Sequence, residues 1–123
     1  MLSAMTLDDA VMWLNDRCGK GVAVWISADD DRLVLSTEGE LRHATDANGA
    51  ADPSLKDCYD VGHIRVFLAQ GNVGVIEYTD DAVRVFMTDR PRIATWPNDD
   101  SRLLVQLDER GILHVVEQKD PPV

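Results

Sequence analysis

Residues 63–88 constrain the fold more than any other part of the sequence. They contain three short segments rich in Val, Ile, Phe and Tyr, separated by turn-forming pairs: 63–69, 73–79 and 82–88. Segments of this length and composition, joined through Gly-Asn or Asp-Asp, are typical of antiparallel strands connected by hairpins. The sequence therefore predicts a three-stranded antiparallel meander.

The turns of this meander decide which side chains share a face, because directly opposed residues point to the same side of a sheet. A two-residue turn at 71–72 pairs Phe67 with Ile76, and a two-residue turn in the second hairpin makes Glu77 the neighbour of Arg84. A turn of three residues, or a bulge, would move every side chain to the other face. With two-residue turns, two similar Arg-x-Phe motifs point to opposite faces: Arg65/Phe67 and Arg84/Phe86.

Both faces of the predicted meander carry large apolar side chains. One face has Phe67, Ile76, Tyr78, Val85 and Met87, and the other has Ile64, Val66, Leu68, Val75 and Phe86. A sheet that is apolar on both faces must be covered on both. The interior of a barrel or sandwich covers one face, and the helix, a second sheet or a second subunit must cover the other. Because one helix is too small for a whole face, the pattern favours a homodimer.

The clearest helical pattern lies near the start of the chain. Apolar residues recur at i, i+3, i+4 and i+7 from Leu7 to Cys18. Thr6 is a suitable N-cap, and Gly19 is a suitable residue to end a helix. We therefore expect one helix over residues 6–18, with Leu14 of its apolar stripe in the core.

The rest of the sequence indicates strands and turns. Further strands are expected at 22–27, 32–45, 93–96, 102–107 and 112–118, with Val24 in the core and 93–96 at a sheet edge. Gly39 should bulge or bend the long segment, and 46–60 has the composition of a loop. The tail 119–123 contains two prolines and should fray.

These elements predict a single α+β domain over residues 1–123. One N-terminal helix packs on a mostly antiparallel, strongly bent sheet of roughly six to seven strands. The β-rich part spans 22–118, and the sheet forms either a small barrel or a two-layer meander.

The charge balance limits the class of partner. The 123 residues include 22 acidic and 12 basic side chains, so the net charge is −10. Binding to bare nucleic acid is disfavoured, because Lys and Arg must neutralise the phosphates. A basic protein would instead be attracted. We expect a cytoplasmic protein with no membrane contact, since there is no signal-peptide pattern, no long apolar run and too few cysteines for a disulfide framework.

Sequence motifs of catalysis and metal binding are missing or incomplete. Cys58 and His63 have the spacing of half a zinc site, but no second Cys/His pair accompanies them. The same two residues could serve nucleophilic catalysis only with an oxyanion site, which the sequence does not indicate. There is no phosphate-binding glycine motif and no G-x-S-x-G motif. We therefore expect no enzymatic activity, no cofactor and no metal.

The expected function is a non-enzymatic, acidic protein-interaction module of the inhibitor, immunity or adaptor type, which binds another, basic, protein. Recognition is expected through acidic turns together with an apolar surface, at Asp29, Asp30, Asp31, Asp80, Asp81, Asp99, Asp100 and Trp96. Two alternatives stay open. One is a small-ligand-binding or catalytic β-barrel whose interior uses Trp25, Tyr78 and the histidines. The other is a nucleic-acid mimic that inhibits a nucleic-acid-binding protein.

Overall fold

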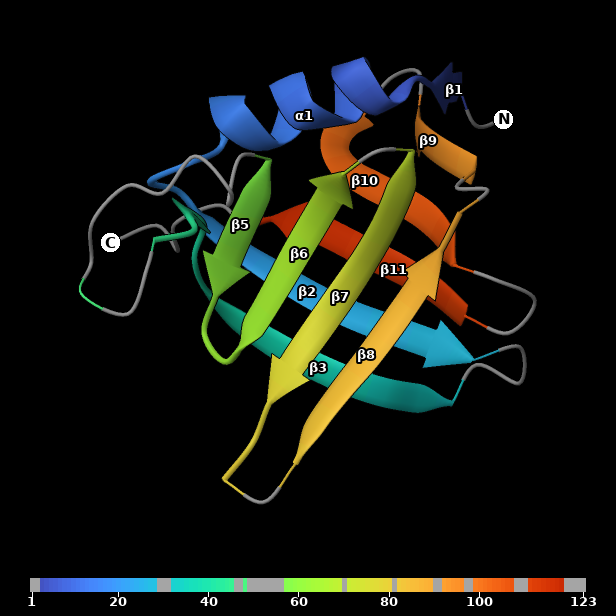
Figure 1. Cartoon of the computed structure of the whole chain (residues 1–123). Helices are drawn as coiled ribbons and strands as arrows, with labels where there is room; N and C mark the ends of the chain where they lie inside the picture. The colour runs from blue at the N-terminus through green and yellow to red at the C-terminus, as the bar shows by residue number, and fades with distance from the viewer. Residues whose placement is uncertain are drawn as a thin grey trace.

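A computed structural model describes residues 3–28, 32–45, 48, 57–69, 71–80, 82–89, 92–96, 99–107 and 111–118. Sheet A contains, in spatial order, β1 (Ser3–Met5), β9 (Arg92–Trp96), β10 (Asp99–Leu107), β11 (Gly111–Glu117), β2 (Gly21–Ala28) and β3 (Leu33–Glu40). Sheet B contains β4 (Arg42–His43), β5 (Cys58–Val61), β6 (Ile64–Ala69), β7 (Asn72–Tyr78) and β8 (Val83–Thr88). The two sheets pack face to face, and their strands cross steeply (Figure 1).

The expected α+β class and antiparallel pairing are confirmed, but the predicted single bent sheet is wrong. The described strands form two sheets, and the chain passes from one to the other between β3 and β4. At this point the Leu41 N–H donates to the carbonyl of Lys20 at 2.9 Å, which extends the β2–β3 pairing by one residue before the chain turns toward β4. The bend expected at Gly39 therefore lies next to a change of sheet, as is usual at the corners of orthogonally packed sheets.

Two short strands are not predicted by the sequence. The β5 strand overlaps the end of the expected loop 46–60, most of which is outside the described residues, as is the tail 119–123. The β1 strand pairs with β9, so the expected strand at 93–96 exists but does not lie at the edge. Strands as short as β1 and β5 carry too few residues for a recognisable alternation.

The helix α1 (Leu7–Asp16) begins where the capping pattern places it. The Asp9 N–H donates to Thr6 Oγ1 at 3.1 Å, and the Thr6 N–H donates to Asp9 Oδ2 at 3.3 Å, which makes a reciprocal capping box. The helix ends two residues before the predicted limit. Its Arg17 C-cap has left helical geometry, and the guanidinium instead packs 3.9 Å from the centre of the Trp13 ring.

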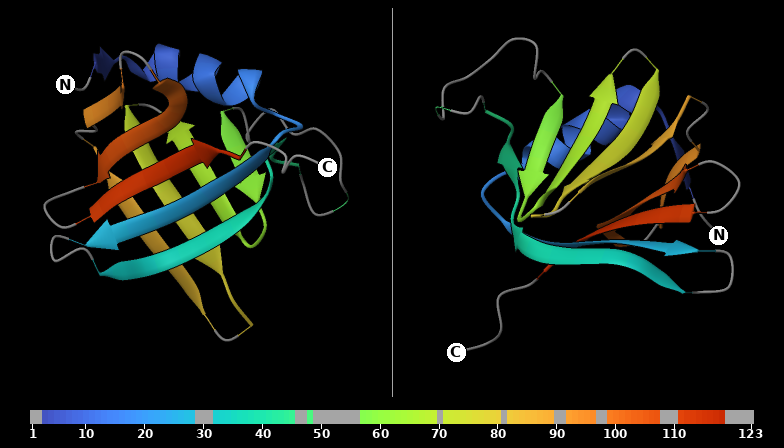
Figure 2. Two further views of the ribbon diagram at one scale, coloured as in Figure 1. Left: turned by 180° about the vertical axis from the view of Figure 1, so that it is seen from behind. Right: turned by 60° about the horizontal axis from the view of Figure 1, so that its bottom comes forward.

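The helix closes one end of the space between the sheets rather than covering a sheet face (Figures 1 and 2). Its residues Ala10, Trp13 and Leu14 are buried in the core, so the expectation for Leu14 is confirmed. The hydroxyl of buried Tyr59 on β5 donates to Asn15 Oδ1 at 2.6 Å and so fastens sheet B to the helix.

The β7–β8 hairpin has the predicted register, with Glu77 opposite Arg84. The β6–β7 hairpin is shifted by two residues, so Phe67 lies opposite Gly74 and not Ile76. The Phe67 ring occupies the space that a side chain at Gly74 would need. Because the shift is an even number, the faces are unchanged, and the two Arg-x-Phe motifs point to opposite sides as expected.

The inner faces of both sheets make one core. Val24 of β2 is fully buried, as expected, and sheet B contributes the face that includes Ile64, Val66 and Val75. The opposite face of sheet B, which includes Val85 and Met87, is exposed to solvent. The second apolar face of the meander therefore has no cover within the described part of this chain.

Candidate functional site

The β7–β8 hairpin projects beyond the rest of the molecule. Figures 1 and 2 show that its turn extends past the edges of both sheets. In Figure 1 the outer face of β6, β7 and β8 is turned toward the viewer, with no element in front of it. Most residues of its β8 strand are exposed.

The outer face of the hairpin carries four large, exposed apolar side chains. Tyr78, Val83, Val85 and Met87 are 44%, 59%, 58% and 53% exposed, and we call these four the apolar patch. Tyr78 and Val83 are direct cross-strand neighbours, and Val85 and Met87 continue along β8 on the same face. Contiguous exposed apolar side chains of this kind form the larger patches on a monomer's surface, and such patches are often functional.

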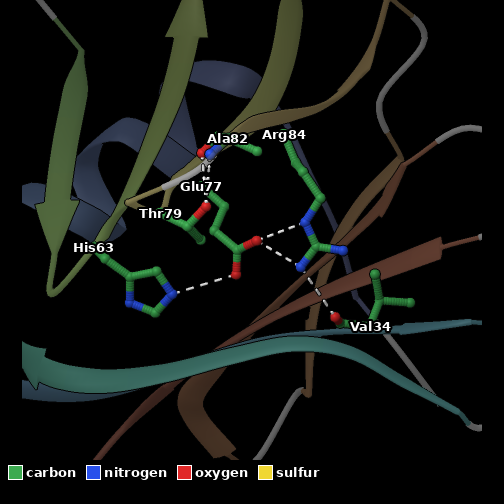
Figure 3. A network of polar contacts seen from close by, with 6 residues as sticks. All are labelled: Val34, His63, Glu77, Thr79, Ala82 and Arg84. Carbon is green, nitrogen blue, oxygen red and sulfur yellow. Dashed lines mark hydrogen bonds and ion pairs between the residues drawn. The ribbon is translucent and has the colours of Figure 1, made fainter.

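The inner face of the same hairpin is held by a polar network (Figure 3). The carboxylate of Glu77 is almost fully buried, and its Oε1 accepts a hydrogen bond from Arg84 Nε at 2.6 Å, so the expected cross-strand pair is confirmed. His63 Nε2 lies 3.3 Å from Glu77 Oε2. Arg84 Nη2 also donates to the carbonyl of Val34 at 3.5 Å. Because Val34 belongs to β3, the network joins the hairpin to sheet A.

Hydrogen bonds between Thr79 and Ala82 close the turn of the hairpin. The Thr79 hydroxyl and the Thr79 N–H both donate to the Ala82 carbonyl, at 2.8 and 2.9 Å, and the Ala82 N–H donates to Thr79 Oγ1 at 3.1 Å. Asp80 is exposed in this turn. The turn therefore presents a carboxylate directly beside Tyr78 and Val83 of the apolar patch.

Of the acidic residues expected to bind a partner, the structure places Asp80 beside an apolar surface. Four others lie outside the described residues: Asp29, Asp30, Asp31 and Asp81. Asp99 and Asp100 are the first residues of β10, not a turn, and Asp99 is the backbone partner of Trp96. The side chains of these three residues are outside the described part, so their expected role stays a prediction.

The sequence pattern predicts that the patch residues share one face of the meander, but it does not indicate that this face is a binding site. The two faces are similarly apolar, and only the fold shows which one is exposed. The Asp-Asp turn next to Tyr78 and Val83 is the one local signal that could have singled out this end of the meander.

The aromatic and histidine residues proposed for a barrel interior lie elsewhere. Trp25 and His114 stack on each other on the outer face of sheet A, with ring centres 4.7 Å apart. Tyr78 is part of the apolar patch, and His43 and His63 are exposed. The space between the sheets is filled by the core side chains. In the described part of the chain, two open depressions of about 580 and 520 Å³ lie along sheet A, lined mainly by residues of β2–β3 and of β1, β9 and β10.

One nucleophile–base pair occurs on this outer face of sheet A. Ser27 Oγ and His114 Nε2 are hydrogen-bonded at 3.0 Å, and burial lowers the pKa of His114. Nucleophilic catalysis also needs a group that orients the base and donors for an oxyanion. Among the described residues, no carboxylate is hydrogen-bonded to His114, so the pair forms an incomplete catalytic arrangement.

The cysteines and possible metal ligands give no second site. Cys18 and Cys58 are both free thiols, and burial raises the pKa of each. His63 contacts Glu77, whereas Cys58 is buried opposite Phe67. The described residues contain no group of three or more His, Cys, Asp or Glu side chains placed to hold a metal ion.

No helix in the described part of the chain has both the length and the apolar character needed to cross a membrane. Comparison with protein-family models, with curated proteins and with solved structures found no match to this chain. The inference of function therefore depends on the geometry of the described residues.

Proposed function

We propose that this protein is a non-enzymatic interaction module, of the inhibitor, immunity or adaptor type, that binds another protein through the β7–β8 hairpin. The observation that carries the proposal is the apolar patch on a projecting hairpin. Contiguous exposed apolar side chains with a polar rim mark protein interaction sites. Tyr and Met are also enriched in such interfaces.

The hydrogen bonds within the hairpin support the proposal. The Glu77–Arg84 pair holds the two strands together on the inner face, and the Thr79–Ala82 bonds hold the turn. A surface that is already ordered loses little conformational entropy on binding, so more of the interaction energy appears as affinity.

The charge supports a basic partner. The chain carries a net charge of −10, and Asp80 is exposed at the tip beside the apolar patch. Such a field accelerates the encounter with a positively charged protein.

A mimic of nucleic acid is supported less well, because the described exposed acids are dispersed over α1, β3 and the β7–β8 turn, as in Asp8, Glu38 and Asp80.

The test compares three immobilised proteins in a pull-down from the native host: the wild type, Val85→Asp and Ile112→Asp. Ile112 is the matched control, because it is a β-branched residue, 41% exposed, on the outer face of the other sheet. We expect a partner retained by the wild type and by Ile112→Asp but lost with Val85→Asp. Equal retention by all three proteins would reject the patch as the binding surface.

Sedimentation velocity of the same three proteins tests whether a homodimer covers the patch. In that case the wild type and Ile112→Asp would sediment as dimers and Val85→Asp as a monomer. A heterologous partner predicts monomers for all three at micromolar concentration.

A further inference from the structure

Among the described strands, β8 is one of the two edge strands of sheet B, and β4 is the other. In the described part of the chain, β7 is the only hydrogen-bonded neighbour of β8. An edge strand of this kind has a row of backbone N–H and C=O groups without a strand partner, and another chain can pair with them.

The hairpin register identifies these backbone groups. The Thr79 N–H donates to the Ala82 carbonyl, so this pair is a hydrogen-bonded one. In an antiparallel ladder the hydrogen-bonded and non-hydrogen-bonded pairs alternate. Arg84 and Phe86 therefore bond to β7. The N–H and C=O groups of the residues that alternate with these two point to the open edge: Val83, Val85 and Met87.

The same three residues supply most of the apolar patch. Each of them presents its side chain on the outer face and its backbone groups at the edge. A bound strand could therefore make main-chain hydrogen bonds and apolar contacts with one set of residues, which is the pattern of recognition by strand addition.

The edge lacks the usual protection against such pairing. Natural edge strands are blocked by Lys, Pro, a bulge or an unpaired inward charge. The β8 sequence VRVFMT contains no Lys or Pro, and its pairing with β7 has no bulge. Its inward charge, Arg84, is already paired with Glu77, so a new strand would not leave it without a partner.

We infer that β8 accepts an extended segment of a basic partner as a sixth strand of sheet B, an inference that rests on the proposed function. Exposed Asp80 precedes β8 and exposed Asp89 follows it. Two copies paired antiparallel along β8 would bring the Asp89 end of one chain to the Asp80 end of the other, and each chain carries a net charge of −10. A segment with apolar residues at alternate positions and Lys or Arg between them would pack against the apolar patch and would also complement the negative charge of the chain.

The probe is a fluorescent synthetic peptide of about eight residues, the usual strand length, with alternating Val and Lys. Two further peptides carry N-methyl groups on all Val or on all Lys residues, which removes one alternate set of backbone donors without changing the charge. In an added antiparallel strand, the donors that face β8 belong to residues whose side chains lie on the outer face. Those residues are Val, which continues the apolar patch.

Fluorescence anisotropy at low salt measures the three affinities. We expect methylation of Val to weaken binding by roughly tenfold or more and methylation of Lys to change it little. The reverse pattern would indicate parallel addition and would still support the inference. Equal affinities, or no binding by the unmodified peptide at millimolar concentration, would overturn it.

Amide hydrogen exchange followed by NMR supplies the second readout. In the free protein, the N–H groups of Val83, Val85 and Met87 should exchange quickly and those of Arg84 and Phe86 slowly, and the peptide should protect the first three. Protection of the first three without peptide, increasing with protein concentration, would show self-pairing and overturn the inference. If Val85→Asp abolishes partner binding while the edge amides stay unprotected in the complex, the proposed function stands and strand addition fails.

Discussion

Gly74 is the position where a single methyl group should disturb the outer face of sheet B most. A Cβ atom there would overlap the Phe67 ring and lie 2.8 Å from the carbonyl oxygen of Phe86. The ring can turn away, but the carbonyl belongs to the β7–β8 ladder and can move only if the hairpin distorts. Overpacking of this kind typically costs about 1–3 kcal/mol of unfolding free energy.

The matched control is Gly21→Ala on β2. An added Cβ at Gly21 would meet only Gln118 side-chain atoms, at 3.7 and 3.9 Å, which is ordinary van der Waals contact. Ala at such a site restricts the unfolded chain and should stabilise the protein by about 0.4–1 kcal/mol. The two substitutions are chemically identical, so the difference in their effects isolates the contacts at Gly74.

Urea unfolding followed by tryptophan fluorescence gives both free energies. We expect the midpoint to fall for Gly74→Ala and to stay level or rise for Gly21→Ala, with the same dependence on urea for both. If Gly74→Ala is as stable as Gly21→Ala, Phe67 does not lie over Gly74, and the two-residue shift of the β6–β7 hairpin is wrong.

Three further predictions concern the core, the polar network and pH. Leu14→Ala should cost about 2–5 kcal/mol in the same unfolding assay, because Leu14 is fully buried; a loss below about 0.5 kcal/mol would place the helix outside the core. Arg84→Met should destabilise the protein more than Glu77→Gln, because the first leaves a buried carboxylate with only a histidine, whereas the Arg84 side chain is 49% exposed and stays hydrated; the opposite order would contradict the network. Burial lowers the pKa of His114 below its ordinary value of 6.5, so the unfolded chain binds this proton more readily. The unfolding free energy should therefore fall as the pH drops through about 6.5, and the fall should be smaller in His114→Gln; equal pH profiles of the two proteins would contradict this assignment.

The structure joins two properties in β8 that are usually kept apart. Its outward side chains are apolar, and its backbone forms an open edge, although either property alone favours association. The stability of the fold does not require apolar side chains at Val83, Val85 and Met87, because all three are exposed. Their arrangement is the basis of the proposal that a partner contacts the strand.

Local sequence patterns were sufficient for the elements whose partners are near in the chain. Thr6 and Asp9 are three residues apart, and their capping box begins the helix where predicted. Glu77 and Arg84 are joined by a short turn, and their pairing follows from the position of that turn. In both cases the chain itself brings the interacting groups together, so little loop-closure entropy opposes them.

The sequence could not indicate the elements that depend on distant partners. The three residues of β1 become a strand because β9, some ninety residues away, supplies their hydrogen bonds. The division into two sheets depends on β4 pairing with β5, across the segment 44–57, and not with a strand of sheet A. Neither interaction has a local signal, because in both the paired strands are separated by a long segment of the sequence.

The sequence determined that the meander has two apolar faces, and only the tertiary structure decided which of them is buried. The inner face contains Glu77, which a pattern of hydrophobicity alone would place outside. Burial of this carboxylate is tolerable because Arg84 and His63 satisfy its oxygens, and a buried charge without such partners is costly. The opposite face contains no described acid on β7 or β8, yet it is the one exposed to solvent, because sheet A packs on the other side.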